Sequence, residues 1–326
     1  MSLLPTVSIV IVSWNAKDYL FECLKSLKDG AYTGPMEIIV VDNASADGSA
    51  EMVRQQFPYV KLICNAQNLG FAKANNIGIR HCTGEYVALI NSDVHALPDC
   101  ITTLVIYCQN QPTAGLVGPF IIGRDGKQQM SCRGAPNLWN MLCRALALDV
   151  VFSRSRFFNG YFLGHWDHCT TASVDILSGC FWLTPRPTLD NVGLLDESFF
   201  IYGEDMDWCK RFRDAGWDVR FVPEARAIHY GGASSANSPI RFFVEKQKAD
   251  VQYWRKHHSR IAVGVYYAIS LLHHGLRIVG YSLRACFARR KDQIAWYKVR
   301  RSVACVRWFI TSDLALDRRV PRSWIL

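Results

Sequence analysis

Three carboxylates fall within four residues of the stretch 203–207, directly after an aromatic run. On a helix that begins here, Glu204 and Trp208 share one face. The helix dipole favours acidic side chains in a first turn, which accounts for one of the three acids. Apolar neighbours raise the pKa of a carboxylate, which suits it to act as a general base. The cluster of Glu204, Asp205 and Asp207 is therefore a candidate source of a general base.

A second group of polar residues follows three apolar runs that are typical of buried strands. These residues are Ser13 and Asn15, then Asp42 and Asn43, then Asn91, Ser92 and Asp93. In an open parallel sheet, ligands bind beyond the carboxyl ends of the strands, where the three groups would converge. A turn or a helix N-cap explains each group alone, and we prefer that explanation for Asp47 and Ser49. For Asp42 and Asp93 the coincidence favours ligand binding.

The sequence offers no glycine-rich cradle for phosphate. Neither G-x-G-x-x-G after a strand nor G-x-x-x-x-G-K-[ST] occurs, so dinucleotide and Walker-type sites are unsupported. A nucleoside diphosphate would then need a divalent metal on a carboxylate to neutralise its charge, and Asp93 is placed for this. His229, just before Gly231 and Gly232, is a further candidate, with a structural role as the equal alternative.

The elements that must position these residues alternate between strand and helix. Apolar β-branched runs predict strands and apolar residues at helical spacing predict helices. The expected strands are 7–12, 37–41, 60–64 and 85–90, and the expected helices are 17–27, 47–57, 71–80 and 98–109. Four such repeats with short connections predict a mostly parallel α/β sheet with helices on its faces.

The second half of the chain is less regular. Residues 115–185 contain one good strand candidate, at 176–184. After them we expect a helix at 206–215, a strand at 218–222, a small-residue loop at 231–239 and a charged helix at 241–258.

The net charge of +9 is concentrated at one end of the chain. Residues 277–326 hold twelve basic and three acidic residues, whereas the first 276 residues hold 25 of each. The twelve cysteines form no C-x-x-C pair and no zinc-ligand spacing, which fits a reducing cytosol. We expect the apolar run at residues 3–12 to be a buried strand and not a signal peptide, since it lacks a basic leader.

Residues 261–276 carry no formal charge, and basic residues flank them on both sides. Sixteen residues fall short of the ~20 that span a bilayer, and extension to residue 283 admits Arg277. A helix lying on an anionic membrane surface suits this pattern better than a spanning helix, and a core helix is a further alternative. Bulky apolar residues among the arginines of the tail also favour a membrane surface over nucleic acid.

With these residues in view, the chain resembles glycosyltransferase family 2, the inverting enzymes of GT-A fold, and most of all the bacterial rhamnosyltransferase-like branch of surface-polysaccharide assembly. The resemblance covers residues 7–235. Its motifs are VSIVIVSWN, VDNASADGS, NLGFAKANNIGI, LINSDV, SGCFWLTPR, LLDESFFIYGEDMDWCKR and AIHYGGASS.

The resemblance implies a role for each matching residue. Asp205 would be the catalytic base, Trp208 would face the acceptor, and Asp93 would be the last acid of a D-x-D-like metal motif. Asn91 stands where many members have an acid, which leaves one carboxylate for Mg²⁺ or Mn²⁺, and His229 would join the metal shell. The donor nucleotide would contact Ser13, Asn15, Asp42, Asn43, Asn68, Asn75, Asn91, Ser92 and Asp93.

The resemblance also implies the reaction. An acceptor hydroxyl, deprotonated by Asp205, would attack the anomeric carbon of a dTDP- or UDP-linked sugar, rhamnose as the first guess, with inversion. The acceptor would be a saccharide or a polyprenyl-diphosphate-linked sugar. Residues 1–240 would form the GT-A domain and 241–326 a helical, basic and apolar segment that holds a cytoplasmic enzyme on the inner face of the cytoplasmic membrane.

Two other classes remain open. The first is a catalytically silent GT-A domain that binds glycans or partners, which the departure at Asn91 favours. The second is a nucleotidyltransferase, which also places carboxylates on an α/β sheet. The missing basic, glycine-rich N-terminal loop argues against it.

Overall fold

The computed structural model describes residues 4–30, 32–231, 239–288 and 292–311. Most of the expected loop at 231–239, the basic run at 289–291 and the basic residues beyond Thr311 lie outside the described residues. The described residues group into two units. Residues 4–133 and 167–231 form what we call the sheet unit, and residues 134–166 and 239–311 form the helical unit. The division at residue 240 stays a prediction, and the helical unit adds the segment 134–166 to the C-terminal helices.

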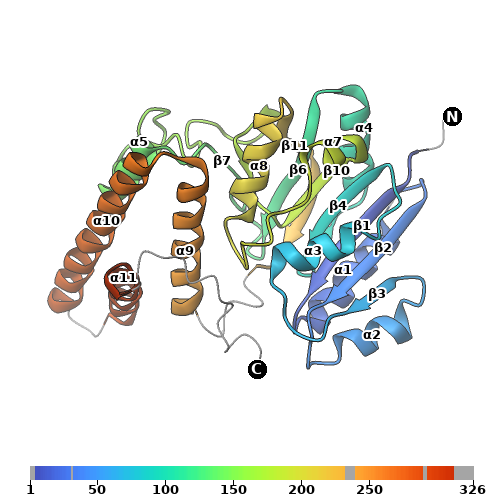
Figure 1. Ribbon diagram of the computed structural model, residues 1–326, viewed down its shortest axis with the longest axis horizontal. Helices are drawn as coiled ribbons and strands as arrows, with labels where there is room; N and C mark the ends of the chain where they lie inside the picture. Colours follow the sequence, from blue (N-terminus) through green and yellow to red (C-terminus); the bar gives the residue numbers. More distant parts are fainter. Residues whose placement is uncertain (1–3, 31, 232–238, 289–291, 312–326) are drawn as a thin grey trace. The chain divides into compact units, whose positions relative to one another are not determined.

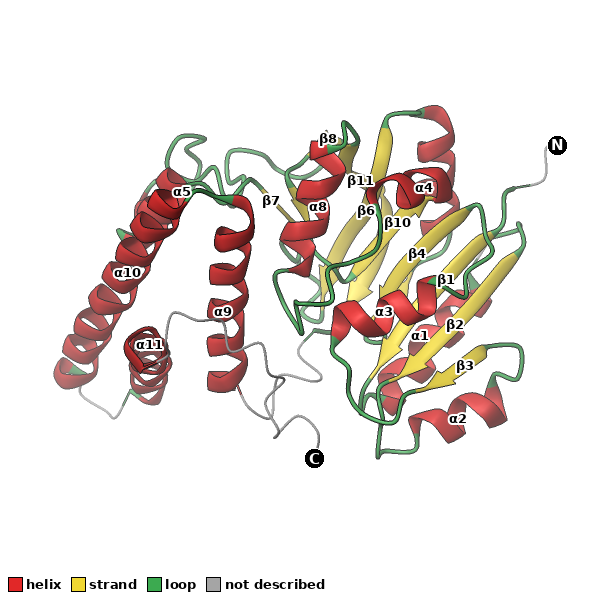
Figure 2. Ribbon diagram, viewed as in Figure 1, coloured by secondary structure: helices red, strands yellow, loops and turns green. Residues whose placement is uncertain are grey.

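The sheet unit is built on a nine-stranded mixed sheet in the order β3-β2-β1-β4-β10-β6-β11-β5, with β8 on β11 (Figures 1 and 2). Its strands are β1 (Val7–Ser13), β2 (Met36–Asp42), β3 (Lys61–Cys64), β4 (Tyr86–Asn91), β5 (Val94–Ala96), β6 (Ala114–Gly123), β8 (Ala172–Ser173), β10 (Phe181–Pro185) and β11 (Asp218–His229). The run β3-β2-β1-β4 is parallel throughout, as predicted. Beyond β4 the strand β10 is antiparallel to both its neighbours.

Helices cover both faces of the sheet. They are α1 (Lys17–Asp29), α2 (Ser49–Gln56), α3 (Phe71–Ile79), α4 (Cys100–Asn110), α7 (Arg186–Val192) and α8 (Glu204–Asp214). One continuous apolar core joins α1, α2 and α4 to the sheet face that carries Ile9, Ile11 and Val40. On the opposite face Gly78 of α3 lies against Val10, where a Cβ would approach to 2.3 Å. Burial on both faces explains the β-branched sequence of β1.

The prediction of one continuous strand at 176–184 is wrong. Residues 176–184 instead hold β9 (Ile176–Leu177), a turn, and the start of β10. β9 leaves the main sheet and pairs with β7 (Cys132–Arg133) in a small antiparallel sheet. The break follows Ser178-Gly179, and the ring of Trp182 lies 3.1 Å from where a Gly179 Cβ would stand.

The strand expected at 218–222 is longer in the structure, and the strand β6 is not predicted by the sequence pattern. β11 continues to His229 through an irregularity between Val222 and Arg226, where Pro223 interrupts the ladder with β6. β6 contains Gly115, Gly118 and Pro119, residues that weaken a strand pattern. Parallel pairing with the long strand β11 offsets those preferences.

The helical unit contains α5 (Leu138–Ala145), α6 (Leu148–Val151), α9 (Pro239–His257), α10 (Arg260–Phe287) and α11 (Gln293–Thr311). Helix α10 packs against α5, α9 and α11. The helix expected at 241–258 is present as α9, and the apolar run at 261–276 lies within the longer helix α10. α10 is long and apolar enough to cross a membrane by length and composition, and no other helix of the described residues is.

Candidate functional site

The three polar groups that follow β1, β2 and β4 meet at one edge of the sheet. Ser13 at the end of β1 lies in register with Asp42 at the end of β2. Val12 of β1 lies in register with Asn91 at the end of β4. Parallel pairing therefore brings these strand ends side by side, as the sequence predicts.

Two polar atoms at this edge are buried without a hydrogen-bond partner among the described residues. They are Ser13 Oγ and Asp42 Oδ1. The other oxygen of Asp42 accepts the Ser45 N–H at 2.9 Å, which fixes the carboxylate. A buried oxygen without a partner costs free energy, about 1–3 kcal/mol by mutational data. A ligand that donates hydrogen bonds here would remove that cost.

The neighbouring loops hold one another through their own polar groups. Asn15, at a left-handed φ of 50°, donates its N–H to Ser45 Oγ and accepts the Ala46 N–H. Asp47 accepts the N–H groups of Lys17 and Ser49. Burial raises the pKa of Asp47, but these hydrogen bonds outweigh it and hold the pKa below its usual value. The structural interpretation of Asp47 is therefore confirmed.

Three of the five asparagines expected to contact the nucleotide have their side-chain amides engaged within the protein. Asn43 donates to the Gly70 carbonyl at 3.1 Å and accepts from Asn65 at 2.9 Å. Asn68 accepts the Gly70 N–H, and Asn75 donates to the Phe71 carbonyl. All three are nearly fully buried. Asn43 and Asn68 shape the loop that enters α3, whereas Asn75 bonds within that helix.

Asp93 and His229 come together although 136 positions separate them in the sequence. His229 ends β11 and lies in register with Val94 of β5. Its ring therefore lies beside the turn that precedes β5, which carries Asp93. His229 Nε2 lies 3.2 Å from Asp93 Oδ1, and His229 Nδ1 lies 3.1 Å from Gln129 Oε1. Ser92 occupies the same turn as Asp93.

This pair fits a shared cation. If Nδ1 carries the proton that Gln129 accepts, the Nε2 lone pair faces a carboxylate oxygen, an arrangement that a cation between them stabilises. The described residues contain no group of three His, Cys, Asp or Glu side chains that could hold a metal ion. Asp93 and His229 would therefore supply two ligands, and phosphate oxygens or water would supply the others.

Asp205 stands in the first turn of α8 and forms an ion pair with Arg133 of β7. Its other oxygen accepts the Met206 N–H at 2.9 Å. Both charged side chains are about five-sixths buried, with exposed fractions of 17% for Arg133 and 15% for Asp205. The small β7–β9 sheet carries Arg133, and α8 packs on β9, which explains how the pair is held.

Sequence reasoning missed the segment that joins these two places. Gln129 contacts His229, and Arg133, four residues later, contacts Asp205. Four residues span at most ~14 Å. The candidate base and the candidate metal pair therefore contact one short stretch of chain. The only sequence signal was an isolated arginine in an irregular region.

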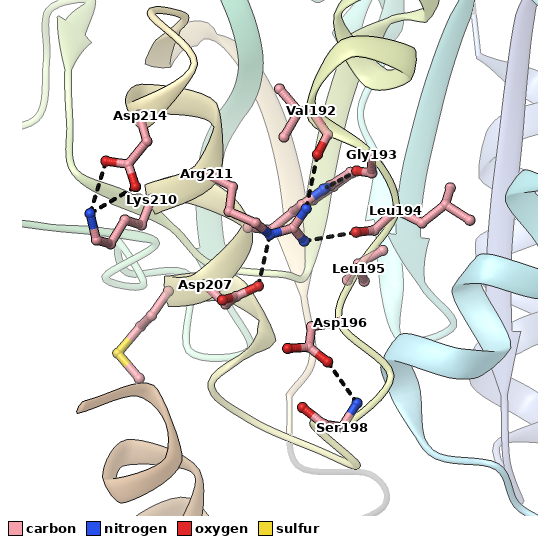
Figure 3. A network of polar contacts seen from close by, with 12 residues as sticks. Val192, Gly193, Leu194, Leu195, Asp196, Ser198, Asp207, Lys210, Arg211 and Asp214 are labelled. Carbon is pink, nitrogen blue, oxygen red and sulfur yellow. Dashed lines mark hydrogen bonds and ion pairs between the residues drawn. The ribbon is translucent and has the colours of Figure 1, made fainter. Parts of the chain in front are cut away.

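The third acid of the cluster, Asp207, has a structural partner. Its carboxylate is fully buried and accepts from Arg211 Nε at 2.9 Å (Figure 3). Arg211 also donates to the carbonyls of Val192 and Leu194. This network fixes α8 to the loop before it. Glu204 is buried at the helix start, where the dipole favours its charge.

The expectation that Trp208 faces an acceptor is wrong. The side chain has no exposed surface, packs against Trp182 and Phe212, and donates its indole N–H to the Gly193 carbonyl. The indole, four residues after Glu204, points into the core because α8 buries that face against the rest of the sheet unit. Trp208 therefore stabilises α8.

Three buried thiols lie near the acids. Burial raises the pKa of Cys180 to about 12, with the charge of Asp93 adding to it. Burial likewise raises the pKa of Cys209 to about 12 and that of Cys23 further. All three remain neutral at physiological pH, so carboxylates supply the negative charge here.

Comparison with known proteins finds glycosyltransferases that are similar in sequence. Residues 8–168 match the glycosyl transferase family 2 model. An N-acetylglucosaminyl-diphospho-decaprenol L-rhamnosyltransferase of Mycobacterium tuberculosis is 28% identical over 77% of this chain and 84% of the relative. The dTDP-rhamnosyl transferase RfbF of Shigella flexneri is 25% identical over 80% of this chain and 82% of its own.

Solved glycosyltransferases share the fold. The mannosyltransferase PcManGT of Pyrobaculum calidifontis, solved with GDP-Man and Mn²⁺, aligns over 96% of this chain and 77% of its own with a TM-score of 0.53 and 18% identity. TarS of S. aureus aligns over 94% of this chain and 82% of its own with a TM-score of 0.50 and 16% identity. The chain has the GT-A fold, as the sequence predicts.

Proposed function

Since the chain belongs to glycosyltransferase family 2, we propose that it moves a sugar, with rhamnose as first choice, from a nucleoside-diphosphate donor to a hydroxyl of a saccharide or lipid-linked acceptor in surface-polysaccharide assembly. The donor base would be thymidine or uridine. The observation that carries this proposal is the sheet edge where Ser13 Oγ and Asp42 Oδ1 are buried without partners among the described residues, beside the Asp93–His229 pair.

The nucleoside would occupy the ends of β1 and β2. Asp42 would accept a hydrogen bond from the base or the ribose, and Ser13 would donate or accept a second one. Asn15, Asn43 and Asn68 would act by shaping the loops around the nucleoside, and Asn75 by stabilising the first turns of α3. Asn91 and Ser92 would line the turn that carries Asp93.

Asp93 and His229 would hold Mg²⁺ or Mn²⁺. When bound, the ion would neutralise the diphosphate and stabilise it as a leaving group. The described residues contribute no second carboxylate to the cation, so phosphate oxygens and water would complete its shell.

Asp205 would accept the proton of the acceptor hydroxyl, and that oxygen would attack the anomeric carbon from the side opposite the diphosphate. Arg133 would hold the Asp205 carboxylate in one orientation. Glu204 would stand beside the base. One base suffices because the leaving group departs as a diphosphate and needs no general acid.

A lipid-linked acceptor requires the enzyme to work at a membrane. We place the enzyme on the cytoplasmic face of the cytoplasmic membrane, with residues 1–240, apart from 134–166, as the catalytic domain and 241–326 as the attachment segment. The segment 134–166 would belong with that attachment segment, because it clusters with the C-terminal helices.

The test is calorimetric titration of the full chain with dTDP and UDP, with and without Mn²⁺. Wild type is expected to bind one of them in a metal-dependent way, and Asp93→Ala is expected to lose that metal dependence. Asp99→Ala, an exposed acid just before α4, is the matched control. Unchanged metal dependence in Asp93→Ala would remove Asp93 from the site, and absence of binding to any nucleoside diphosphate would contradict the proposed function.

A further inference from the structure

Helix α10 exposes its apolar side. Eight apolar residues at intervals of three or four form a stripe along it: Ile261, Val265, Ala268, Leu272, Leu276, Val279, Leu283 and Phe287. All eight are exposed, and the exposed fraction reaches 81% at Ile261 and 84% at Phe287. The stripe contains no charge. At 1.5 Å per residue the helix is ~42 Å long, so this apolar surface is too extended to be incidental.

The opposite side of α10 is polar, and it is the buried side. Tyr266, Ser270 and His274 are each less than a tenth exposed. Gln247 of α9 bonds two of them, donating to Tyr266 Oη at 3.0 Å and lying 3.1 Å from His274 Nε2. A helix of a water-soluble bundle has the reverse arrangement. α10 is therefore suited to an apolar environment along its stripe.

The helical unit is also the positive part of the chain. Its described residues include fifteen basic and four acidic side chains, a net charge of +11. Three of those four acids already pair, with Lys248, Lys246 and Arg284. The described residues of the sheet unit have sixteen basic and 22 acidic side chains, a net charge of −6. The positive charge therefore accompanies the exposed apolar stripe.

A second exposed apolar group belongs to the same unit. Val150 and Val151 at the end of α6 are each 70% exposed, and Phe157 is 63% exposed. Arg154 and Arg156 lie between them in the sequence. Apolar side chains interleaved with arginine suit the boundary between headgroups and acyl chains.

The stripe does not suit a helix that crosses a bilayer. A spanning helix of this unit would carry its polar side, and the charged helices packed on that side, into hydrocarbon. Helix α9 alone has seven charged residues. An in-plane position leaves the polar side and its partners in water and immerses the stripe alone.

A second copy of the chain also suits the stripe poorly. Two helical units face to face would bring two net charges of +11 together. An anionic bilayer offers the opposite charge and an apolar layer beneath it.

Building on the proposed function, we infer that α10 lies in the plane of an anionic phospholipid bilayer, with the stripe Ile261–Phe287 immersed among the acyl chains and the basic residues of the helical unit at the headgroups. The acceptor would then meet the enzyme at the surface on which α10 rests. The occupant of the stripe is the bilayer itself.

The test is flotation of the full chain with vesicles of phosphatidylcholine alone or with one-third phosphatidylglycerol. We expect wild type to float with the anionic vesicles, and less so at 0.5 M salt. The double variant Leu272→Asp/Leu276→Asp should partition at least ~10-fold less, since each leucine loses its burial in the acyl layer. Ile106→Asp is the matched control, because Ile106 and Leu272 are both 42% exposed and Ile106 belongs to the sheet unit.

Four outcomes overturn the inference. They are a wild type that does not float, a double variant that floats as well as wild type, membrane-bound protein that resists alkaline carbonate, and a dimer that only the double variant breaks. Thermal unfolding of each variant shows that it is folded. Sugar transfer by wild type is measured separately on the same preparation, so failure of the proposed function and failure of vesicle binding are distinguishable.

Discussion

At the scale of single residues, the contact between Arg133 and Asp205 determines how the candidate base is presented. A carboxylate at the start of a helix can adopt several rotamers. Here one oxygen is held by the Met206 N–H and the other by the guanidinium. Because a small misplacement of a reacting group costs a large factor in rate, we assign Arg133 a positioning role.

We predict that Arg133→Met lowers kcat about 10–100-fold and leaves the donor KM unchanged, with Arg133→Lys recovering part of the loss. Steady-state kinetics on the purified chain measures both constants. Arg213→Met is the control, because Arg213 pairs with Asp175 at 2.6 Å and not with the base. A raised donor KM with normal kcat would instead assign Arg133 to donor binding.

The sequence alone predicts the roles of some site residues and not of others. Asp42 and Asp93 could be singled out because strand ends converge at a sheet edge, a rule that holds for any parallel sheet. Trp208 could not, because an aromatic side chain after an acidic pair is as compatible with the core as with a ligand. Arg133 gave no signal, since its partner is distant in sequence and its strand has two residues.

At the scale of elements, regular repeats were predictable and interruptions were not. The helices and strands of residues 7–110 follow the hydrophobic period and agree with expectation to within a few residues, except for the three-residue strand β5, which was not expected. The separation of β9 from β10 depends on the Trp182 ring beside Gly179, a tertiary contact with no local signature. The inverted amphipathicity of α10 likewise required the neighbouring helices, because a stripe in sequence does not say which side is covered.

Glu37 shows how one side chain ties three elements together. It accepts hydrogen bonds from Ser8 Oγ, from the N–H and Oγ1 of Thr83, and from the Gly84 N–H. Burial raises the pKa of Glu37, but these four hydrogen bonds outweigh it and hold the pKa below its usual value. A depressed folded-state pKa contributes stability above the unfolded pKa, and that stability is lost as the pH falls through the folded value.

We therefore predict that Glu37→Gln lowers Tm at pH 7 and that its difference from wild type shrinks as the pH falls below 4. Thermal unfolding at a series of pH values measures this. Glu51→Gln, which removes an exposed i,i+3 ion pair, should change Tm little at any pH. A Tm difference that is independent of pH would mean that the carboxylate charge does not contribute.

At the scale of the whole molecule, the two units divide chemistry and charge. The sheet unit carries every candidate donor and base residue and a net charge of −6, and the helical unit carries +11. Sequence alone located the excess charge in the last fifty residues but could not add the segment 134–166, because only tertiary contacts group it with the C-terminal helices. The central claim is that the sheet unit transfers sugar with Asp205 as base.

The measurement that tests this claim most directly is the release of nucleoside diphosphate from dTDP- and UDP-sugars, with acceptor and Mn²⁺, by wild type and by Asp205→Asn. Asp214→Asn, an exposed acid at the end of the same helix, is the control. We predict release by wild type and the control, and turnover lower by about 10²–10⁴-fold in Asp205→Asn with donor binding preserved. Full turnover by Asp205→Asn would contradict the account.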